Sequence, residues 1–287
     1  MNPRIPHAFE TDDEYRAADG ENWSRLKHLR TSPKHYRYRI DNPEADTSSR
    51  GMLRATHCLA LEPSVFDRDF AVYEGRRDKR AAAYKAFLAD AEGKTVLSPR
   101  ELSEATAVAD AVKSDPAVRA MLDAPGVEVY YELPILWTDP VFGVPCKAKL
   151  DILIVDWEAG TATVVDLKTV RRIDPRGMAR DAEQMGYHGQ IAGHYARAAA
   201  AVTGFHEDAI ECAIIAVEGK APHDVGIFAF SPADVWQGRR LRDSLMTRRA
   251  ECIAADNWPG KVPAPVSLDL PCYDAGLNEE PEITIGG

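Results

Sequence analysis

The chain has 287 residues, of which 45% are hydrophobic and 8% aromatic, and its formal net charge is −10. This length suits one large domain or two small ones, and the composition excludes a disordered, collagen-like or solenoid protein. The charge argues against nucleic-acid binding by overall attraction, although a basic groove within an acidic shell stays compatible with it.

Targeting segments and cysteine frameworks are not indicated by the sequence. No apolar run of about 18 residues is present, and the N-terminus lacks the apolar stretch of a signal peptide, so we expect a soluble, intracellular protein without a membrane partner. The five cysteines form no CxxC or CxxH pair, which argues against zinc ribbons and disulfide scaffolds. We expect them to be reduced, partly buried thiols.

The first third of the chain is predicted to be helical, behind a polar segment, residues 1–20, that we expect to be loosely docked. The spacing of Trp23, Leu26 and Leu29 indicates a helix from Glu21 to Arg30, which Ser32-Pro33 ends. Three further helices are predicted over residues 48–61, 76–91 and 101–122.

After Gly126 the pattern changes to apolar, β-branched runs separated by turns, which predict strands. The expected strands lie within residues 127–137, 144–157, 161–170, 209–217 and 224–230. Helices are expected over residues 178–203 and 231–256, the second beginning at Ser231-Pro232. The sequence thus predicts an α/β fold with a central mixed sheet: a domain over residues 21–256, divided into a helical wall (21–125) and a sheet core (126–256), and a proline-rich acidic tail (257–287).

The segment KLDILIVDWEAGTATVVDLKTV holds the strongest chemical signal. Asp151 is expected to open one strand, and Asp166 and Lys168 to lie on one face at the end of the next, so that a hairpin joins two carboxylates and an ammonium. Hard oxygen ligands suit Mg²⁺ or Mn²⁺, which can activate water near a phosphate, while a lysine supports the charged transition state. Alone, a D-x-K triplet is more often a solvated ion pair, but a charged pair after the apolar run TATVV is costly unless it has a function.

These residues resemble the signature of PD-(D/E)xK nucleases, which have a restriction-endonuclease-like core. More specifically, GMLRATHCLALEPSVF resembles a segment of the RecE-type (exonuclease VIII) branch of RecB-like nucleases, and ENWSRLKHLRTSPKHY resembles the segment before it. ELPILWTDPVFGVPCKAKLD and GYHGQIAGHY resemble the segments that flank the hairpin in that branch. The resemblance covers roughly residues 20–200 in the same order.

The resemblance implies a role for each matching residue. His57, Asp151, Asp166 and the backbone carbonyl of Leu167 would be metal ligands, with Glu132 as a further acid. Lys168 would be the catalytic lysine, and Gln190 and Tyr187 would lie near the scissile phosphate or the DNA end. The tyrosine expected four residues after the glutamine is His194 here, with Tyr195 one position later, which leaves the roles of both open.

Two basic clusters bear on a nucleic-acid substrate. Residues 168–180 hold five basic residues and one acid, net +4, and Arg171, Arg172 and Arg176 among them are candidate DNA contacts. Residues 76–85 also carry a net charge of +4, which we interpret as a solvated helix face. Lys147 and Lys149, beside Asp151, are expected to face solvent or phosphate.

The resemblance implies a Mg²⁺-dependent 5′→3′ exonuclease of phage or prophage origin in a bacterial cytoplasm, with Mn²⁺ as a substitute ion. It would act on linear double-stranded DNA with free ends and expose a 3′ single strand for a single-strand annealing protein. A homo-oligomeric ring is expected, and an iron–sulfur cluster is not, because the necessary cysteines are missing. Two alternatives stay open: a structure-specific endonuclease with the same metal site, and a non-catalytic DNA-binding or assembly protein that retains a nuclease fold.

Overall fold

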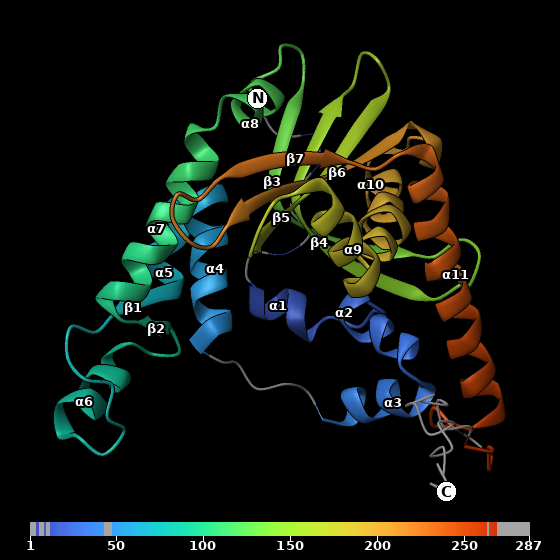
Figure 1. The fold of residues 1–287 in the computed structure, drawn as a ribbon, viewed down its shortest axis with the longest axis horizontal. Helices are drawn as coiled ribbons and strands as arrows, with labels where there is room; N and C mark the ends of the chain where they lie inside the picture. The colour runs from blue at the N-terminus through green and yellow to red at the C-terminus, as the bar shows by residue number, and fades with distance from the viewer. Residues whose placement is uncertain (1–3, 6–8, 10–11, 43–47, 263, 269–287) are drawn as a thin grey trace, which may run out of the picture.

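A five-stranded mixed sheet lies at the centre of the computed structural model, with helices on both faces and a small lobe at one corner (Figure 1). The structure describes residues 4–5, 9, 12–42, 48–262 and 264–268. The strand order is β3-β4-β5-β6-β7, in which only β5 and β6 are parallel. The strands are β3 (Glu128–Thr138), β4 (Pro145–Asp156), β5 (Thr161–Val170), β6 (Ile210–Glu218) and β7 (Val225–Ala229).

The first face of the sheet is covered by α4 (Ser48–Leu61), α7 (Pro99–Ser114) and α8 (Pro116–Leu122). Apolar residues of these helices pack on the residues of β4, β5 and β6 that point to this face. The hydrophobic cluster between these helices and the sheet includes Leu61, Val108, Val118, Ile152, Val165, Leu167 and Ile215. Because β5 is central and buried, its apolar run lies where the sequence predicted a central strand.

The second face is covered by α9 (Pro175–Met185), a π-helix (Gly189–Tyr195), α10 (Ala196–Thr203) and the long α11 (Pro232–Ala255). The π-helix and α11 approach closely at glycines. A Cβ atom on Gly193 would lie 2.5 Å from the carbonyl oxygen of Gly238, and one on Gly238 would lie 2.2 Å from that of His188. Side chains at either position would push the helices apart.

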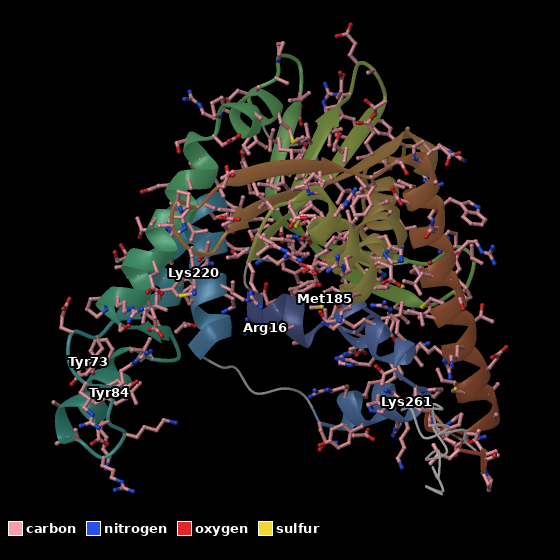
Figure 2. The ribbon with its side chains drawn as sticks, viewed as in Figure 1. Arg16, Tyr73, Tyr84, Met185, Lys220 and Lys261 are labelled. Carbon is pink, nitrogen blue, oxygen red and sulfur yellow. The ribbon has the colours of Figure 1, made fainter. Side chains whose placement is uncertain are left out.

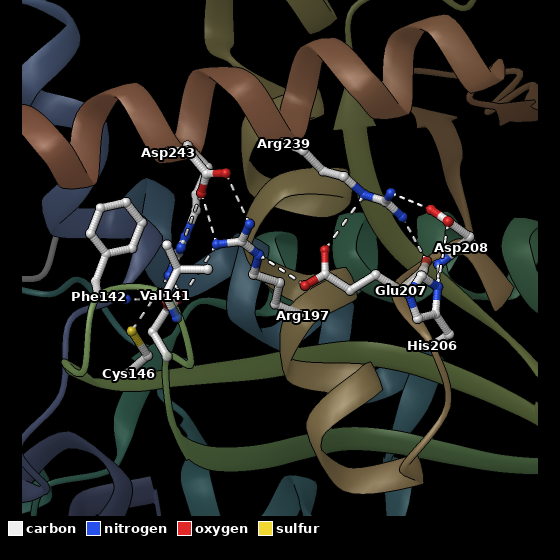
Figure 3. Close-up of polar contacts among 11 residues, drawn as sticks. Val141, Phe142, Cys146, Arg197, His206, Glu207, Asp208, Arg239 and Asp243 are labelled. Atoms are coloured by element: carbon white, nitrogen blue, oxygen red, sulfur yellow. Dashed lines mark hydrogen bonds and ion pairs between the residues drawn. The ribbon is translucent and has the colours of Figure 1, made fainter.

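Buried arginines tie this helical layer to the turn between β3 and β4 (Figure 3). Arg242 of α11, fully buried, is 2.5 Å from Asp139 in that turn, and Arg197 of α10 is 3.3 Å from the same carboxylate. Arg197 also pairs with Asp243 (2.7 Å) and Glu207 (3.2 Å). Each buried charge therefore has an opposite charge in contact, without which its burial would be strongly unfavourable.

Residues 12–20 are docked on the sheet, contrary to the loose docking that we expected for residues 1–20, and residues 1–3, 6–8, 10 and 11 lie outside the described part of the chain. The buried ammonium of Lys147 donates hydrogen bonds to the carbonyls of Tyr15 (2.9 Å), Arg16 (3.0 Å) and Ala18 (2.6 Å), at the end of α1 (Asp12–Ala17). A cation at a helix C-terminus satisfies carbonyls that lack partners within the helix. The expectation that Lys147 faces solvent or phosphate is therefore wrong.

Two short helical segments follow, α2 (Trp23–Leu26) with a 3-10 turn (Lys27–Arg30), and then α3 (Pro33–Asp41). The hydroxyl of Tyr36 in α3 donates to the buried carboxylate of Glu21 (2.5 Å), which also pairs with Arg249 of α11 (2.6 Å). Trp258, after α11, stacks on the Tyr36 ring at 5.7 Å. The beginning of the tail thus packs on α3, and our expectations for residues 269–287 fall outside the described part of the chain.

Three predicted helices differ from the observed ones. The helix expected over residues 76–91 is only α6 (Ala82–Asp90), which lies between the short parallel strands β1 (Phe70–Val72) and β2 (Thr95–Leu97). The helix expected over 101–122 is interrupted at Asp115, because the following Pro116 disfavours a helical backbone before it. The helix expected over 178–203 consists of three segments: α9, the π-helix and α10. After α4, the chain forms a 3-10 turn (Pro63–Val65) and the short helix α5 (Phe66–Asp69).

Two further properties concern the membrane and the cysteines. None of the described helices is both long enough and apolar enough to cross a bilayer. Cys58, Cys146, Cys212 and Cys252 are free and buried, as expected, while Cys272 lies outside the described residues.

Candidate metal centre and active site

The site begins at a paired irregularity in β3 and β4. The two strands keep one register throughout, Tyr131 opposite Ile152 and Leu133 opposite Leu150, but Glu132 and Asp151 between these pairs leave the ladder. Glu132 has a positive φ of 46°, a left-handed conformation that is rare for a residue other than glycine. Backbone conformations of this kind are energetically costly and are concentrated at functional sites.

This irregularity changes the face to which alternate residues of β4 point. Leu150 packs in the core of the second face, whereas Ile152 packs in the core of the first face, although strict alternation would place both on one face. Asp151, between them, therefore lies at the change of face rather than on either face. It lies in the middle of β4, not at its beginning as the sequence suggested.

The strands β4 and β5 separate at the same level. Their pairing ends at Ile152–Val165, so Asp151 and Asp166 are the first residues beyond it. The amide N–H of Leu167 donates instead to Asp151 Oδ2 at 2.8 Å. Because the N–H and C=O of one strand residue point to the same side, the Leu167 carbonyl also faces β4. The gap between the strands thus collects a carboxylate, an amide and a carbonyl.

Helix α4 brings His57 to this gap from the first face. His57 Nδ1 lies 3.6 Å from Asp151 Oδ2 and 3.9 Å from Glu132 Oε1. One ligand atom from each of these residues lies within 4.8 Å of those of the other two, and all three residues are partly buried. An imidazole and two carboxylates at this spacing can hold a divalent metal ion.

Electrostatics at this cluster favour a cation. Burial, followed by the nearby Asp166 and Glu132 carboxylates, raises the pKa of Asp151 well above its ordinary value. Burial lowers the pKa of His57, so its imidazole is neutral, as metal binding requires. Two cations lie close to these carboxylates: the Lys149 ammonium is 2.8 Å from Glu132 Oε2, and the Lys168 ammonium is 2.5 Å from Asp166 Oδ2. Three carboxylates, those of Glu132, Asp151 and Asp166, thus face two ammonium groups. A divalent ion would relieve this repulsion, so the residues fit such an ion.

Asp166 and Lys168 form the second half of the site. Asp166 is 1% exposed, and its Oδ2 is 2.5 Å from the Lys168 ammonium. Burial alone would lower the pKa of Lys168, but the Asp166 and Asp151 carboxylates outweigh it and raise this pKa. The ammonium lies 4.9 Å from the centre of the Tyr187 ring, within the range of a cation–π contact. Asp166 is not one of the three residues that cluster around the candidate metal position.

The π-helix brings Gln190 to Asp166. The Gln190 amide donates to Asp166 Oδ1 at 3.3 Å and to the Tyr195 hydroxyl at 2.8 Å. A π-helix has a wider turn than an α-helix, so residues five apart, here Gln190 and Tyr195, come together on one side. Tyr195 therefore contacts Gln190 although it follows the glutamine by five residues.

His194 points into the core instead. Its Nε2–H donates to the carbonyl of Lys147 at 3.0 Å, and its ring packs 4.9 Å from that of Trp137. Burial lowers the pKa of His194 to about 3, so the ring is neutral. The sequence left the roles of these two neighbours open, because a single extra residue does not reveal a π-helix.

The predicted site residues thus fall into two groups. The structure brings together His57, Glu132, Asp151, Asp166, Leu167, Lys168, Tyr187 and Gln190. Arg171 and Arg172 are exposed between the end of β5 and the start of α9, where Arg172 pairs with Asp174 at 3.1 Å, and Arg176 is exposed in the first turn of α9. Within the described ranges, no hydrogen bond or ion pair joins these arginines to Glu132, Asp151 or Asp166. Lys149, which was expected beside Asp151, pairs with Glu132, and Tyr195, whose role the sequence left open, contacts Gln190.

A family model and one solved structure agree with this architecture. A family model described as a PDDEXK-like domain of unknown function (DUF3799) matches residues 22–263. The crystal structure of a protein named "Putative exonuclease", from Eubacterium rectale, is similar with a TM-score of 0.51 at 13% identity, over 90% of this chain and 96% of that one. An alkaline exonuclease from Laribacter hongkongensis has a TM-score of only 0.27 at 14% identity, over 72% of this chain and 96% of that one. No protein of curated function matches significantly. The predicted fold class is confirmed: a mixed sheet flanked by helices, with a helical N-terminal part.

Proposed function

Because the chain belongs to the family of PDDEXK-like domains (DUF3799), we propose that it is a metal-dependent deoxyribonuclease. We propose further that it is a 5′→3′ exonuclease, which degrades one strand of linear duplex DNA and leaves a 3′ single strand for strand annealing. The observation that carries the proposal is the convergence of His57, Asp151 and Lys168 where β4 and β5 separate.

The metal would be held by the imidazole–carboxylate cluster. His57, Glu132 and Asp151 are its proposed ligands, with Asp166 and the Leu167 carbonyl completing the set. Mg²⁺ is the proposed ion and Mn²⁺ its substitute, since both accept oxygen ligands and retain positions for water and phosphate. When bound, such an ion polarises a phosphodiester and acidifies water.

Lys168 would act on the other side of the reacting phosphate. Its ammonium is held by Asp166 Oδ2 and lies over the Tyr187 ring, so its position is defined before substrate binds. From there it can orient the attacking water by a hydrogen bond and stabilise negative charge that develops on the phosphoryl oxygens. Gln190, which donates to Asp166 Oδ1, keeps that carboxylate oriented and is thus a positioning residue.

Support for the finer parts of the proposal comes from the sequence. The resemblance of Gly51–Phe66 to the RecE-type branch supports the 5′→3′ direction, the annealing partner and a ring-shaped homo-oligomer, which would keep the enzyme on DNA. The exposed Arg171, Arg172 and Arg176 beyond β5 are proposed DNA contacts. Their charges would interact with phosphates without reading sequence.

A digestion assay tests the proposal. Linear duplex, nicked circular and closed circular DNA are incubated with Mg²⁺ and either the wild-type protein or Lys168→Ala. We expect the wild type to degrade only the linear duplex and the variant to be inactive, because the lysine is lost while the metal ligands stay. Cleavage of closed circles would move the assignment to an endonuclease. Absence of cleavage with both Mg²⁺ and Mn²⁺ would contradict the enzyme proposal and leave a binding role.

A further inference from the structure

A small lobe, residues 70–97, projects from the helical wall at the corner seen at the lower left of Figure 1. It consists of the parallel strands β1 and β2 and, between them, a loop and the helix α6. Its basic residues were expected on a solvated helix face. In the structure, residues 76–80 precede α6 and lie in the loop, so this expectation is wrong for most of them.

The lobe has a small aromatic core that gives it a defined shape. The ring of Tyr73 lies 4.8 Å from that of Tyr84 and 4.9 Å from that of Phe87, so the loop is held on α6 (Figure 2). Arg77 anchors the loop from the other side: its guanidinium donates to the carbonyl of Val96 (3.1 Å) and to Glu101 (2.8 Å). The loop is thus fixed to both β2 and α7.

Four cations of the lobe have no such anchoring role. Arg76, Lys79, Arg80 and Lys85 are exposed, and within the part of the chain that the structure describes none of them forms an ion pair or side-chain hydrogen bond. Across residues 76–85 the net charge is +4, whereas that of the whole chain is −10. The positive charge of residues 76–85 would therefore attract phosphates, although the negative net charge of the whole chain repels them.

The lobe is attached to α4, the helix that brings His57 to the metal centre. Arg54 and His57 are three residues apart on α4, so they share one face of this helix. Arg54 contacts the hydroxyl of Thr95 in β2, while His57 contacts Asp151. The other strand, β1, begins at Phe70, directly after α5 (Phe66–Asp69), which itself contacts α4. Both strands of the lobe are therefore connected to α4, the helix that carries His57.

We propose that this lobe binds the phosphate backbone of duplex DNA next to the cleavage site, through Arg76, Lys79, Arg80 and Lys85. The inference rests on the proposed nuclease function and names the surface that positions its substrate. Lysine and arginine contacts to phosphates fix the register of a duplex without reading its sequence. The lobe would therefore set affinity and orientation, while the metal centre performs the hydrolysis.

The test measures duplex binding by a variant in which all four cations are replaced, R76A/K79A/R80A/K85A. Binding of a labelled duplex of about 30 base pairs is followed by fluorescence anisotropy at several salt concentrations, with Ca²⁺ in place of Mg²⁺ to prevent cleavage. We expect binding at moderate salt to be at least about tenfold weaker. We also expect the slope of the logarithm of affinity against the logarithm of salt concentration to be less steep by about three to four, since each lost phosphate contact removes about 0.9 from this slope.

A matched control removes four exposed cations elsewhere, K113A/R119A/R240A/K261A, and thus lowers the net charge equally. Calorimetric Mn²⁺ binding and thermal unfolding of both variants report whether the metal centre and the fold are intact, and we expect neither to change. All the residues that are replaced are exposed in the wild type, so we expect both variants to fold.

Three outcomes would overturn the inference. Equal affinity and equal salt dependence of the lobe variant and the wild type would remove the lobe from DNA binding and leave the nuclease proposal standing. Equal losses in the lobe variant and the control would show an effect of net charge alone. Failure of the wild type to bind duplex DNA at all would overturn the lobe inference together with the proposed function.

Discussion

Asp151 is proposed as a metal ligand, but its charge destabilises the folded protein when no metal is bound. It is surrounded by carboxylates, and burial together with Asp166 and Glu132 raises its pKa well above the ordinary 3.8. A raised pKa means that the folded protein binds more protons than the unfolded chain, so stability falls as pH rises from 3.8 through the folded-state pKa. Without metal, an ionised Asp151 is therefore destabilising at neutral pH.

We expect Asp151→Asn to stabilise the metal-free protein, because it removes this charge and keeps an oxygen acceptor for the Leu167 amide. At pH 7.5 with chelator, unfolding should shift to higher temperature by a few degrees, which corresponds to about 1 kcal/mol for a chain of this size. The gain should shrink toward acid pH, where the wild-type carboxyl is protonated. Scanning calorimetry at several pH values measures this; a lower unfolding temperature in the variant would contradict the repulsion argument.

Gln190 and Tyr195 form a unit, since a single side-chain amide donates to both Asp166 and the Tyr195 hydroxyl. We expect Gln190→Ala and Tyr195→Phe each to lower kcat by about tenfold, and the double variant to be little worse than Gln190→Ala, because both act by orienting Asp166. The comparison is a double-mutant cycle on linear duplex. If the kcat losses of the single variants multiply in the double variant, the two residues act independently. The control for a general disturbance of the π-helix is His194→Phe, which alters only the side of that helix that faces the core.

At the scale of elements, side chains distant in sequence decide how helices dock. Lys147 satisfies three carbonyls at the end of α1, and the arginines of α10 and α11 converge on Asp139 in the β3–β4 turn. The helix break at Asp115-Pro116 is local by contrast: the Asp115 carboxylate accepts hydrogen bonds from the amides of Ala117 and Val118 and begins α8. An aspartate followed by proline is a sequence signal for such a boundary.

We expect Lys147→Met to detach α1 while leaving the sheet intact, because methionine fills the volume but donates no hydrogen bonds. The three carbonyls would lose a charged donor, at a cost of about 1–3 kcal/mol. Limited trypsin digestion, followed by mass spectrometry, should then show much faster cleavage after Arg16. Lys220→Met, at an exposed position on the β6–β7 turn, is the control, and an unchanged cleavage rate in Lys147→Met would contradict the docking role.

For the whole molecule, the candidate metal joins two layers. His57 belongs to the helical wall, whereas Glu132 and Asp151 belong to the sheet. A bound ion would therefore cross-link the wall to the sheet and stabilise the folded state as any ligand of that state does.

We expect Mn²⁺ at about 100 times its dissociation constant to stabilise the wild type by about 2.7 kcal/mol, visible as a rise of several degrees in unfolding temperature. His57→Ala should lose most of this rise, because the ligand from the wall is missing. Unfolding scans with and without metal measure the difference. The same rise in both proteins would mean that the ion binds elsewhere or without the wall. Metal-free samples with chelator give the baseline for each protein.

The sequence by itself determined the fold class, most element types and the residues on which the candidate site is built. Apolar, β-branched runs between turns predicted the strands, and the charges of Asp166 and Lys168 stood out because charges after a buried strand are unfavourable without a function. His57 and Glu132 were indicated by the family resemblance of the segments around them. These signals are local, so they can be read from neighbouring residues. Only the tertiary structure decided the rest: the positive φ of Glu132, the opening of β4 from β5, the π-helix that exchanges Tyr195 for His194, and the burial of Lys147. Each depends on contacts between segments far apart in the chain, and packing between such segments overrides local preference.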